Sequence, residues 1–175
     1  EVIKYGVIRD PAFFAFLEAE REKILTLEAA AVEHTILTCC RIKAEVVEQD
    51  EREGGLRRIL NFGHTIGHAV EAASGYRLIH GLAVAIGMRA VAELALRSGV
   101  AGPEVVAAIT SMLEAYKLPT VIPADLDRAR IRRYLQADKK SIGGRVFFVL
   151  PEAIGRVRIT DQIDPADLEA VLAAS

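Results

Sequence analysis

The segment LAVAIGMRAVAELALRSG, residues 82–99, constrains the fold of this chain more than any other stretch. It is rich in alanine, and its apolar residues fall on nearly every side of a helix. A helix that is apolar nearly all round has to be covered by other elements. Ser98 and Gly99 form a common C-terminal pattern of helices. We therefore expect a central helix that ends at this pair.

Helical patterns recur along the rest of the chain. Pro11 follows Asp10 and begins a helix at its first position, and Thr26 opens a pattern that runs without a breaker to Asp50. A single helix is expected from Leu56 to about Ala73. Further helices are expected over residues 1–6, from Pro103 to before Lys117, after a cap at Asp125 or Asp127, and over 165–174.

The segments RVFFVL and RVRIT, residues 145–150 and 156–160, are rich in β-branched and aromatic residues. PEAIG separates them, which predicts a small hairpin. The fold class is therefore mainly α with one small β-hairpin near the C-terminus. With 175 residues, of which 51% are hydrophobic, the chain suits a single domain over 1–175.

The net charge of −2 and the scattered basic residues give no reason to expect nucleic acid or an anionic membrane as partner. No apolar run approaches the roughly 20 residues that span a bilayer. Cys39 and Cys40 are adjacent and cannot staple the fold, and no secretory segment is recognisable. We expect a reduced, cytoplasmic protein.

Three of the four histidines lie between residues 61 and 81. His64 and His68 are four apart, so on a helix they share one face, and Asn61 lies one turn before His64. His80 precedes the central helix at a loop-to-helix junction, where its side chain can be aimed inward. Two imidazoles, a carboxylate and an open position form a catalytic zinc arrangement. The competing interpretation is that these histidines only pack.

The carboxylate of such a site is not determined by the local sequence. Glu71 and Glu45 are both candidates, and spacing does not choose between them. Periodicity alone would also make His68 a metal ligand.

Four segments, in this order and spacing, resemble the C-terminal half of 3-dehydroquinate synthase, one of the sugar phosphate cyclases. They are EVIKYGVIRD, DEREGGLRRILNFGHTIGHAVEAASGY, HGLAVAIGM and DKKSIGGRVFFVL, which begin at residues 1, 50, 80 and 138. The resemblance implies a helical domain that carries metal and substrate groups. It also implies that the NAD-binding Rossmann-like domain of the full enzyme lies outside this chain, in which no nucleotide fingerprint is found.

Roles carried over from the resemblance give Glu1, His64 and His80 as the ligands of Zn²⁺ or Co²⁺. The remaining roles concern the substrate. His68 and Asn61, with Lys139 or Lys140, would bind its phosphate; Lys43 and Arg57 would bind its carboxylate and nearby hydroxyls; and Lys4 would contact a hydroxyl. His68, Asn61, Lys43 and Arg57 are the expected catalytic group.

One position departs from the family. An acidic residue usually follows the HG pair, and Leu82 replaces it here. The change affects the groups expected to hold the His80 side chain in place, and it leaves the metal ligands themselves unchanged.

The resemblance implies an NAD- and metal-dependent carbon–oxygen lyase. The full enzyme would convert 3-deoxy-D-arabino-heptulosonate 7-phosphate into 3-dehydroquinate and phosphate, in the shikimate route to aromatic amino acids and chorismate. A homodimer is implied too, and this half alone is not expected to turn over. The alternatives are a 2-deoxy-scyllo-inosose or valiolone synthase, a metal-dependent alcohol or glycerol dehydrogenase, and a non-enzymatic helical assembly domain.

Overall fold

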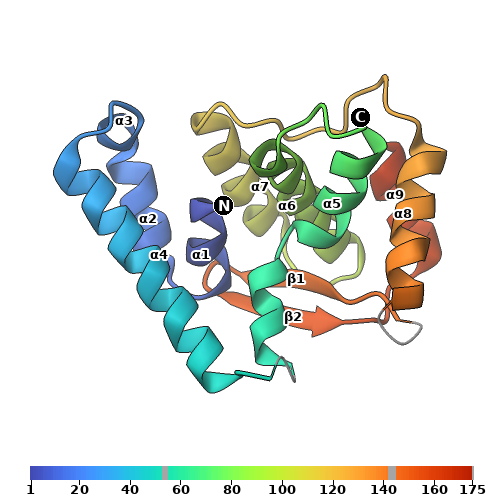
Figure 1. Ribbon diagram of the computed structural model, residues 1–175, viewed down its shortest axis with the longest axis horizontal. Coiled ribbons are helices and arrows are strands. Elements are labelled where there is room, and N and C mark those ends of the chain that lie inside the picture. Colours follow the sequence, from blue (N-terminus) through green and yellow to red (C-terminus); the bar gives the residue numbers. More distant parts are fainter. Residues whose placement is uncertain (53–54, 142–144, 175) are drawn as a thin grey trace.

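The computed structural model describes residues 1–52, 55–141 and 145–174, with only the backbone described for 138–141 (Figure 1). Within these ranges the chain forms α-helices, one 3₁₀ helix (η1) and one antiparallel hairpin, which confirms the mainly α class. In chain order the elements are α1 Val2–Ile8, α2 Pro11–Ala19, α3 Arg21–Leu25, α4 Ala29–Gln49, η1 Leu56–Asn61, α5 His64–Ala73, α6 His80–Arg97, α7 Pro103–Ala115, α8 Arg128–Ser141, β1 Phe148–Ala153, β2 Arg156–Thr160 and α9 Pro165–Ala173.

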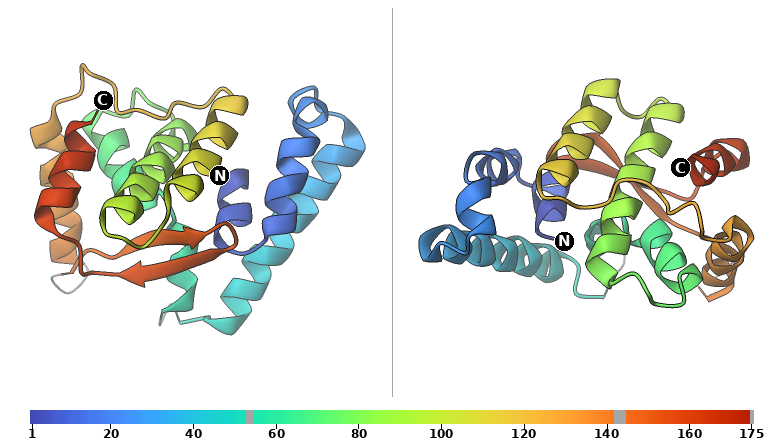
Figure 2. Two further views of the ribbon diagram at one scale, coloured as in Figure 1. Left: turned by 180° about the vertical axis from the view of Figure 1, so that it is seen from behind. Right: turned by 90° about the horizontal axis from the view of Figure 1, so that it is seen from above.

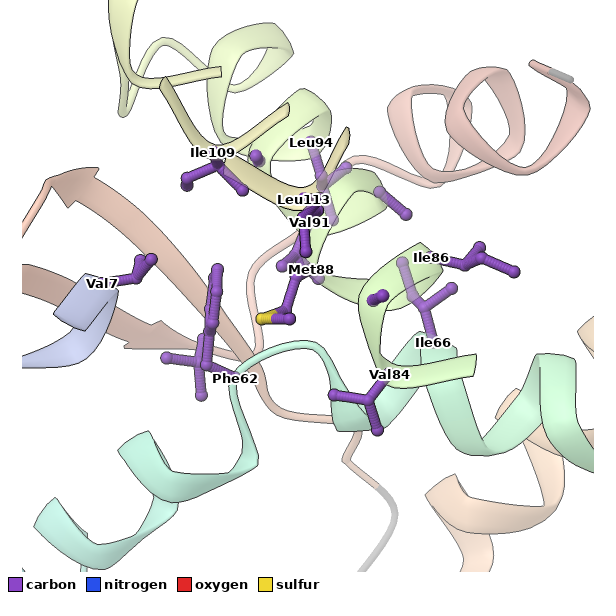
Figure 3. Packing of buried hydrophobic residues seen from close by; sticks show 14 of the residues in the cluster. Val7, Phe62, Ile66, Val84, Ile86, Met88, Val91, Leu94, Ile109 and Leu113 are labelled. Atoms are coloured by element: carbon purple, nitrogen blue, oxygen red, sulfur yellow. The ribbon is translucent and has the colours of Figure 1, made fainter. Parts of the chain in front are cut away.

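Helix α6 lies at the centre, as its composition predicts. It packs against α5, α7, α9 and β1, and every residue from Ala83 to Met88 is buried. Figure 3 shows Met88 reaching from α6 toward Phe62, which is fully buried. The helix begins at His80, two residues before the expected segment. This early start makes His80 the first residue of the most buried helix.

The hairpin runs beneath α6 and α7, and its two strands differ in burial (Figure 2, left). Its strands pair in antiparallel register, with Phe148 opposite Thr160 and Leu150 opposite Arg158. Phe148 and Leu150 are buried, whereas β2 is mostly half-buried or exposed. The Gly155 N–H in the turn donates to the Val7 carbonyl at 2.8 Å, which ties the hairpin to α1. The predicted hairpin is confirmed.

Helices α2, α3 and α4 form an arm to one side of this body (Figures 1 and 2). Asp10 caps α2 by accepting the Phe13 N–H, as expected. The expected helix start at Thr26 is wrong, because α4 begins at Ala29. The Thr26 hydroxyl instead donates to the Glu22 carbonyl at the end of α3, and Leu27 turns the chain with a φ of 61°.

The single helix expected over 56–73 is also wrong. The structure divides it into η1 and α5, with the break at Phe62 and Gly63. Gly63 has a φ of 78°, and a Cβ there would lie 2.9 Å from the Met88 nitrogen. The chain leaves the helical path because Phe62 enters the core and Gly63 touches α6. Asn61 therefore ends η1 and does not share a helix with His64.

Helices α7, α8 and α9 begin at or directly after the prolines and the aspartate that predicted their starts. Proline opens both α7 and α9, and Asp127 rather than Asp125 caps α8 by accepting the Ala129 N–H at 2.8 Å. Of the helices described, none combines the length and apolar content that crossing a membrane requires.

Candidate metal and substrate site

Glycines at the crossing of α5 and α6 bring the histidines together. A Cβ on Gly87 would overlap the Gly63 carbonyl oxygen and lie 2.7 Å from the Gly67 nitrogen. The two backbones therefore touch directly. This contact sets the N-terminus of α5, which carries His64 and His68, beside the first residue of α6, His80.

The three imidazoles form one cluster, half open to solvent. Ring centroids are separated by 5.3 Å for His64–His68, 5.4 Å for His64–His80 and 5.5 Å for His68–His80. One nitrogen of each ring lies within 4.8 Å of the others. His68 is the exposed member, and His64 and His80 are half-buried.

Two of these rings are oriented by acceptors at Nδ1. The Nδ1 of His64 is 3.0 Å from the Phe62 carbonyl oxygen, and the Nδ1 of His80 is 3.1 Å from Glu71 Oε2. The Phe62 carbonyl only accepts, so Nδ1 of His64 carries the proton. His80 lies between two carboxylates, and in the tautomer that leaves Nε2 free for a metal its Nδ1–H donates to Glu71. In both rings Nε2 therefore faces away from the acceptor that Nδ1 contacts.

Glu1, the N-cap residue of α1, lies beside the Nε2 atoms of His64 and His80. Its Oε1 is 3.2 Å from His80 Nε2, and its Oε2 is 3.7 Å from His64 Nε2. Lys4 is buried and its Nζ binds Glu1 Oε2 at 2.6 Å. Lys4 therefore binds one oxygen of the Glu1 carboxylate, and the other oxygen, Oε1, faces His80.

Electrostatics keep these groups in the protonation states that bind a metal. Burial works to raise the pKa of the Glu1 carboxyl, but the hydrogen bond and charge of Lys4 outweigh it and lower the pKa to about 2. Burial lowers the pKa of His64, and its bond to the Phe62 carbonyl opposes this only in part. At neutral pH the site therefore presents an ionised carboxylate beside a neutral imidazole.

The donor set of Glu1, His64 and His80 fits a divalent metal ion. A tetrahedral Zn²⁺ with bonds near 2.0–2.1 Å holds its donor atoms about 3.3 Å apart. The 3.2 Å separation between Glu1 Oε1 and His80 Nε2 is close to that spacing, and His64 Nε2 lies 3.7 Å from the other oxygen of the same carboxylate, Oε2. The histidine triad alone is the competing donor set, with His68 in place of Glu1.

Apart from His68, the residues expected to bind the substrate phosphate and carboxylate lie on other elements. Lys43 is exposed on α4, and Asn61 is exposed at the end of η1, which packs against α4. The Arg57 N–H donates to Asp50 Oδ2 at 2.9 Å, and its guanidinium donates to the Glu51 carbonyl at 3.3 Å. Lys139 and Lys140 fall in the last turn of α8, and their side chains lie outside the described part of the chain.

Three contacts at or near the histidines escaped the sequence analysis. Glu71 was only a candidate ligand there, although its place three residues after His68 puts it on the histidine face of α5. The bond of His64 to the Phe62 carbonyl has no sequence signal, because a backbone group makes it. The Thr65 hydroxyl also donates to the Phe147 carbonyl at 3.0 Å, which ties α5 to the segment before β1.

Comparison with known proteins identifies relatives over nearly the whole chain. Residues 1–141 match the family model described as 3-dehydroquinate synthase C-terminal. The chain is 48% identical over 173 residues to the 3-dehydroquinate synthase of Desulforamulus reducens, and 42% identical over 173 residues to that of Pseudoalteromonas atlantica. These alignments cover 98% of this chain but 48% and 49% of the relatives, so the chain spans about half of their length.

Solved structures of related cyclases share the fold. A 2-epi-5-epi-valiolone synthase from Streptomyces hygroscopicus subsp. jinggangensis, with NAD⁺ and Zn²⁺ bound, superposes with a TM-score of 0.87 at 23% identity, over 98% of this chain and 48% of that one. A 2-deoxy-scyllo-inosose synthase complexed with carbaglucose-6-phosphate, NAD⁺ and Co²⁺ gives 0.81 at 25% identity, over 99% and 50%. The family model and the sequence relatives show that this chain belongs to the 3-dehydroquinate synthase family and corresponds to its C-terminal half.

Proposed function

We propose that this chain is the metal- and substrate-binding half of a 3-dehydroquinate synthase. The activity proposed for a protein of the relatives' full length is conversion of 3-deoxy-D-arabino-heptulosonate 7-phosphate into 3-dehydroquinate and phosphate. One observation carries the proposal beyond the relatives' names: the Nε2 atoms of His64 and His80 both face Glu1, while each Nδ1 is bonded elsewhere. Packing alone does not require this orientation.

Glu1, His64 and His80 are the proposed ligands of Zn²⁺ or Co²⁺, the ions named for the two solved cyclases. A divalent ion at this position supplies polarisation of a substrate hydroxyl and lowers its pKa. Lys4 keeps Glu1 ionised and holds one of its oxygens. NAD⁺ is proposed as the second cofactor and would be bound mainly by the half outside this chain.

The substrate carries a phosphate and a carboxylate, so its site needs several cations and donors. His68 and Asn61, with Lys139 or Lys140, are proposed to bind the phosphate. Lys43 and Arg57 are proposed to bind the carboxylate, for which a guanidinium offers two parallel N–H groups. These side chains bind and orient the substrate, so that its reacting groups are held near the metal position.

A second candidate is a sister cyclase, because the 2-deoxy-scyllo-inosose synthase superposes over nearly the whole chain. Turnover of a panel of sugar phosphates by the full-length protein separates the two. Family membership favours either cyclase over an alcohol dehydrogenase or a non-enzymatic assembly domain. A homodimer and a cytoplasmic location remain predictions.

Zinc binding by this chain tests the proposal directly. We expect about one zinc per chain in the wild type and none in the His64→Ala, His80→Ala double variant, because two of the three ligands are lost. Unfolding curves of both metal-free proteins serve as the control for folding. Equal zinc content in the two proteins, or none in a folded wild type, would contradict the proposed site. The chain alone is expected to show no turnover.

A further inference from the structure

His80 needs an acceptor for its Nδ1 if its Nε2 is to face a metal. Ligand histidines in proteins nearly always donate their other N–H to a carboxylate, a carbonyl or water, which fixes the ring and raises its basicity. His80 is the first residue of α6, where its neighbours offer no such group. The first turn of α6 has no acidic residue, and Leu82 follows two positions later.

Helix α5 provides that acceptor. Glu71 lies seven residues after His64 and three after His68, so all three point to one side of α5. Its Oε2 is 3.1 Å from His80 Nδ1, and its side chain is 19% exposed. The same helix therefore supplies His64 to the site and the carboxylate that orients the third ligand.

We propose that Glu71 is a positioning residue, which holds the His80 ring through Nδ1 so that Nε2 faces the metal position between Glu1 and His64. The inference rests on the proposed metal site. Glu71 bonds the far side of the ring and is not itself a ligand in this arrangement. Its role for His80 parallels that of the Phe62 carbonyl for His64, but it comes from a side chain and can be removed by substitution.

The test compares zinc affinities of the wild type, Glu71→Ala and Glu71→Gln, measured by competition with a chromophoric chelator. Removing such an outer partner typically costs 10- to 100-fold in metal affinity, and we expect a loss of about this size in E71A. E71Q should lose less, because the amide oxygen still accepts the Nδ1–H. Glu93→Ala is the matched control: Glu93 lies on α6, is 20% exposed and pairs with Arg89 and Arg97.

A spectroscopic readout separates orientation from general destabilisation. In the zinc-loaded wild type the Nδ1–H proton of His80 should be protected from solvent exchange, and in E71A that protection should be lost. The Nδ1–H of His64, bonded to the Phe62 carbonyl, is the internal control and should stay protected in both proteins.

The outcomes are distinct. Zinc affinity of E71A within twofold of the wild type, or an equal loss in E93A, would overturn the role of Glu71 and leave the metal site standing. A folded wild type that binds no zinc would overturn the metal site and this inference together. A tenfold or greater loss in E71A, partial rescue in E71Q and selective loss of the His80 signal would establish the inference.

Discussion

Two regions that carry candidate site residues are built in opposite ways. At the crossing of α5 and α6 the backbones touch through Gly63, Gly67 and Gly87, and the histidines project from the edge of a fully buried core. On α4 and η1, by contrast, Lys43 and Asn61 are exposed, and Arg57 is bonded to the neighbouring turn. The first region is fixed by packing between helices, whereas the second is fixed by local hydrogen bonds.

This difference fits the two tasks proposed for them. A metal site needs donor atoms held within a few tenths of an ångström, and a rigid crossing provides that precision. Long cationic side chains on an open edge can instead adjust to an anionic substrate. We therefore expect substitutions at the crossing to affect both stability and metal binding, and substitutions on α4 and η1 to leave metal binding intact.

The largest effect is expected from Gly87→Ala. The added methyl group meets backbone atoms of Gly63 and Gly67, which cannot move aside as a side chain would. Overpacking costs about 1–3 kcal/mol, and a backbone clash should place this variant at the upper end. Calorimetry should show a Tm lower by roughly 6–12 °C, and zinc affinity should fall as α5 and α6 separate.

Gly81→Ala is the control for that variant. It adds the same methyl group to the same helix, and nothing lies within 4 Å of the new Cβ. Its stability should equal or slightly exceed that of the wild type, because alanine favours a helix over glycine. Equal Tm values for the two variants would show that the crossing is not under the packing constraint described.

A smaller effect is expected from His68→Ala, which separates the two donor sets. If Glu1, His64 and His80 bind the metal, zinc affinity should change by no more than about threefold, while binding of inorganic phosphate to the zinc-loaded chain should weaken about tenfold. Titrations followed by NMR measure both. A large loss of zinc would instead favour the histidine triad. His34→Ala, on α4 against Phe16, is the matched substitution away from the site.

Asp50→Ala tests the second region. Asp50 Oδ2 accepts the N–H groups of Gly55 and Arg57 at 2.8 and 2.9 Å, so it stabilises the start of η1. Losing such a cap costs about 1 kcal/mol, which urea unfolding can measure. Zinc affinity should be unchanged, and Asp50→Asn should recover part of the stability. A loss of zinc in D50A would show that the two regions are coupled.

The accuracy of the sequence predictions follows the same division between local and tertiary causes. The central helix, the Asp10 cap and the hairpin were predicted because local composition determines them. The break at Gly63 was missed because the apolar spacing continues through it, and the chain turns there because Phe62 enters the core and Gly63 packs against α6. The helix start predicted at Thr26 was wrong for a local reason, since the Thr26 hydroxyl bonds backward to the Glu22 carbonyl and Leu27 turns the chain.

For the site, spacing placed His64 and His68 on one face but could not choose their carboxylate. Glu1 is distant in sequence, and it was proposed through resemblance rather than periodicity. Glu71 was on the right face, yet nothing in the sequence says that it bonds His80, because that contact depends on the crossing of α5 and α6. Positions within an element were predictable, and contacts between elements were not.

The smallest expected effect concerns the pH dependence of the metal-free chain. The pKa of Glu1 is lowered from 4.5 to about 2, so its pairing with Lys4 stabilises the fold fully above pH 4.5 and is lost as the pH falls from 4.5 toward 2. Because the Glu1 side chain is 41% exposed, screening limits the contribution to about 1 kcal/mol or less. In urea unfolding, wild type and Glu1→Gln should differ at pH 7 and pH 5, the difference should be smaller at pH 3, and the two proteins should converge near pH 2. A difference that stays constant down to pH 3 would mean that Glu1 acts through its packing and not through its charge.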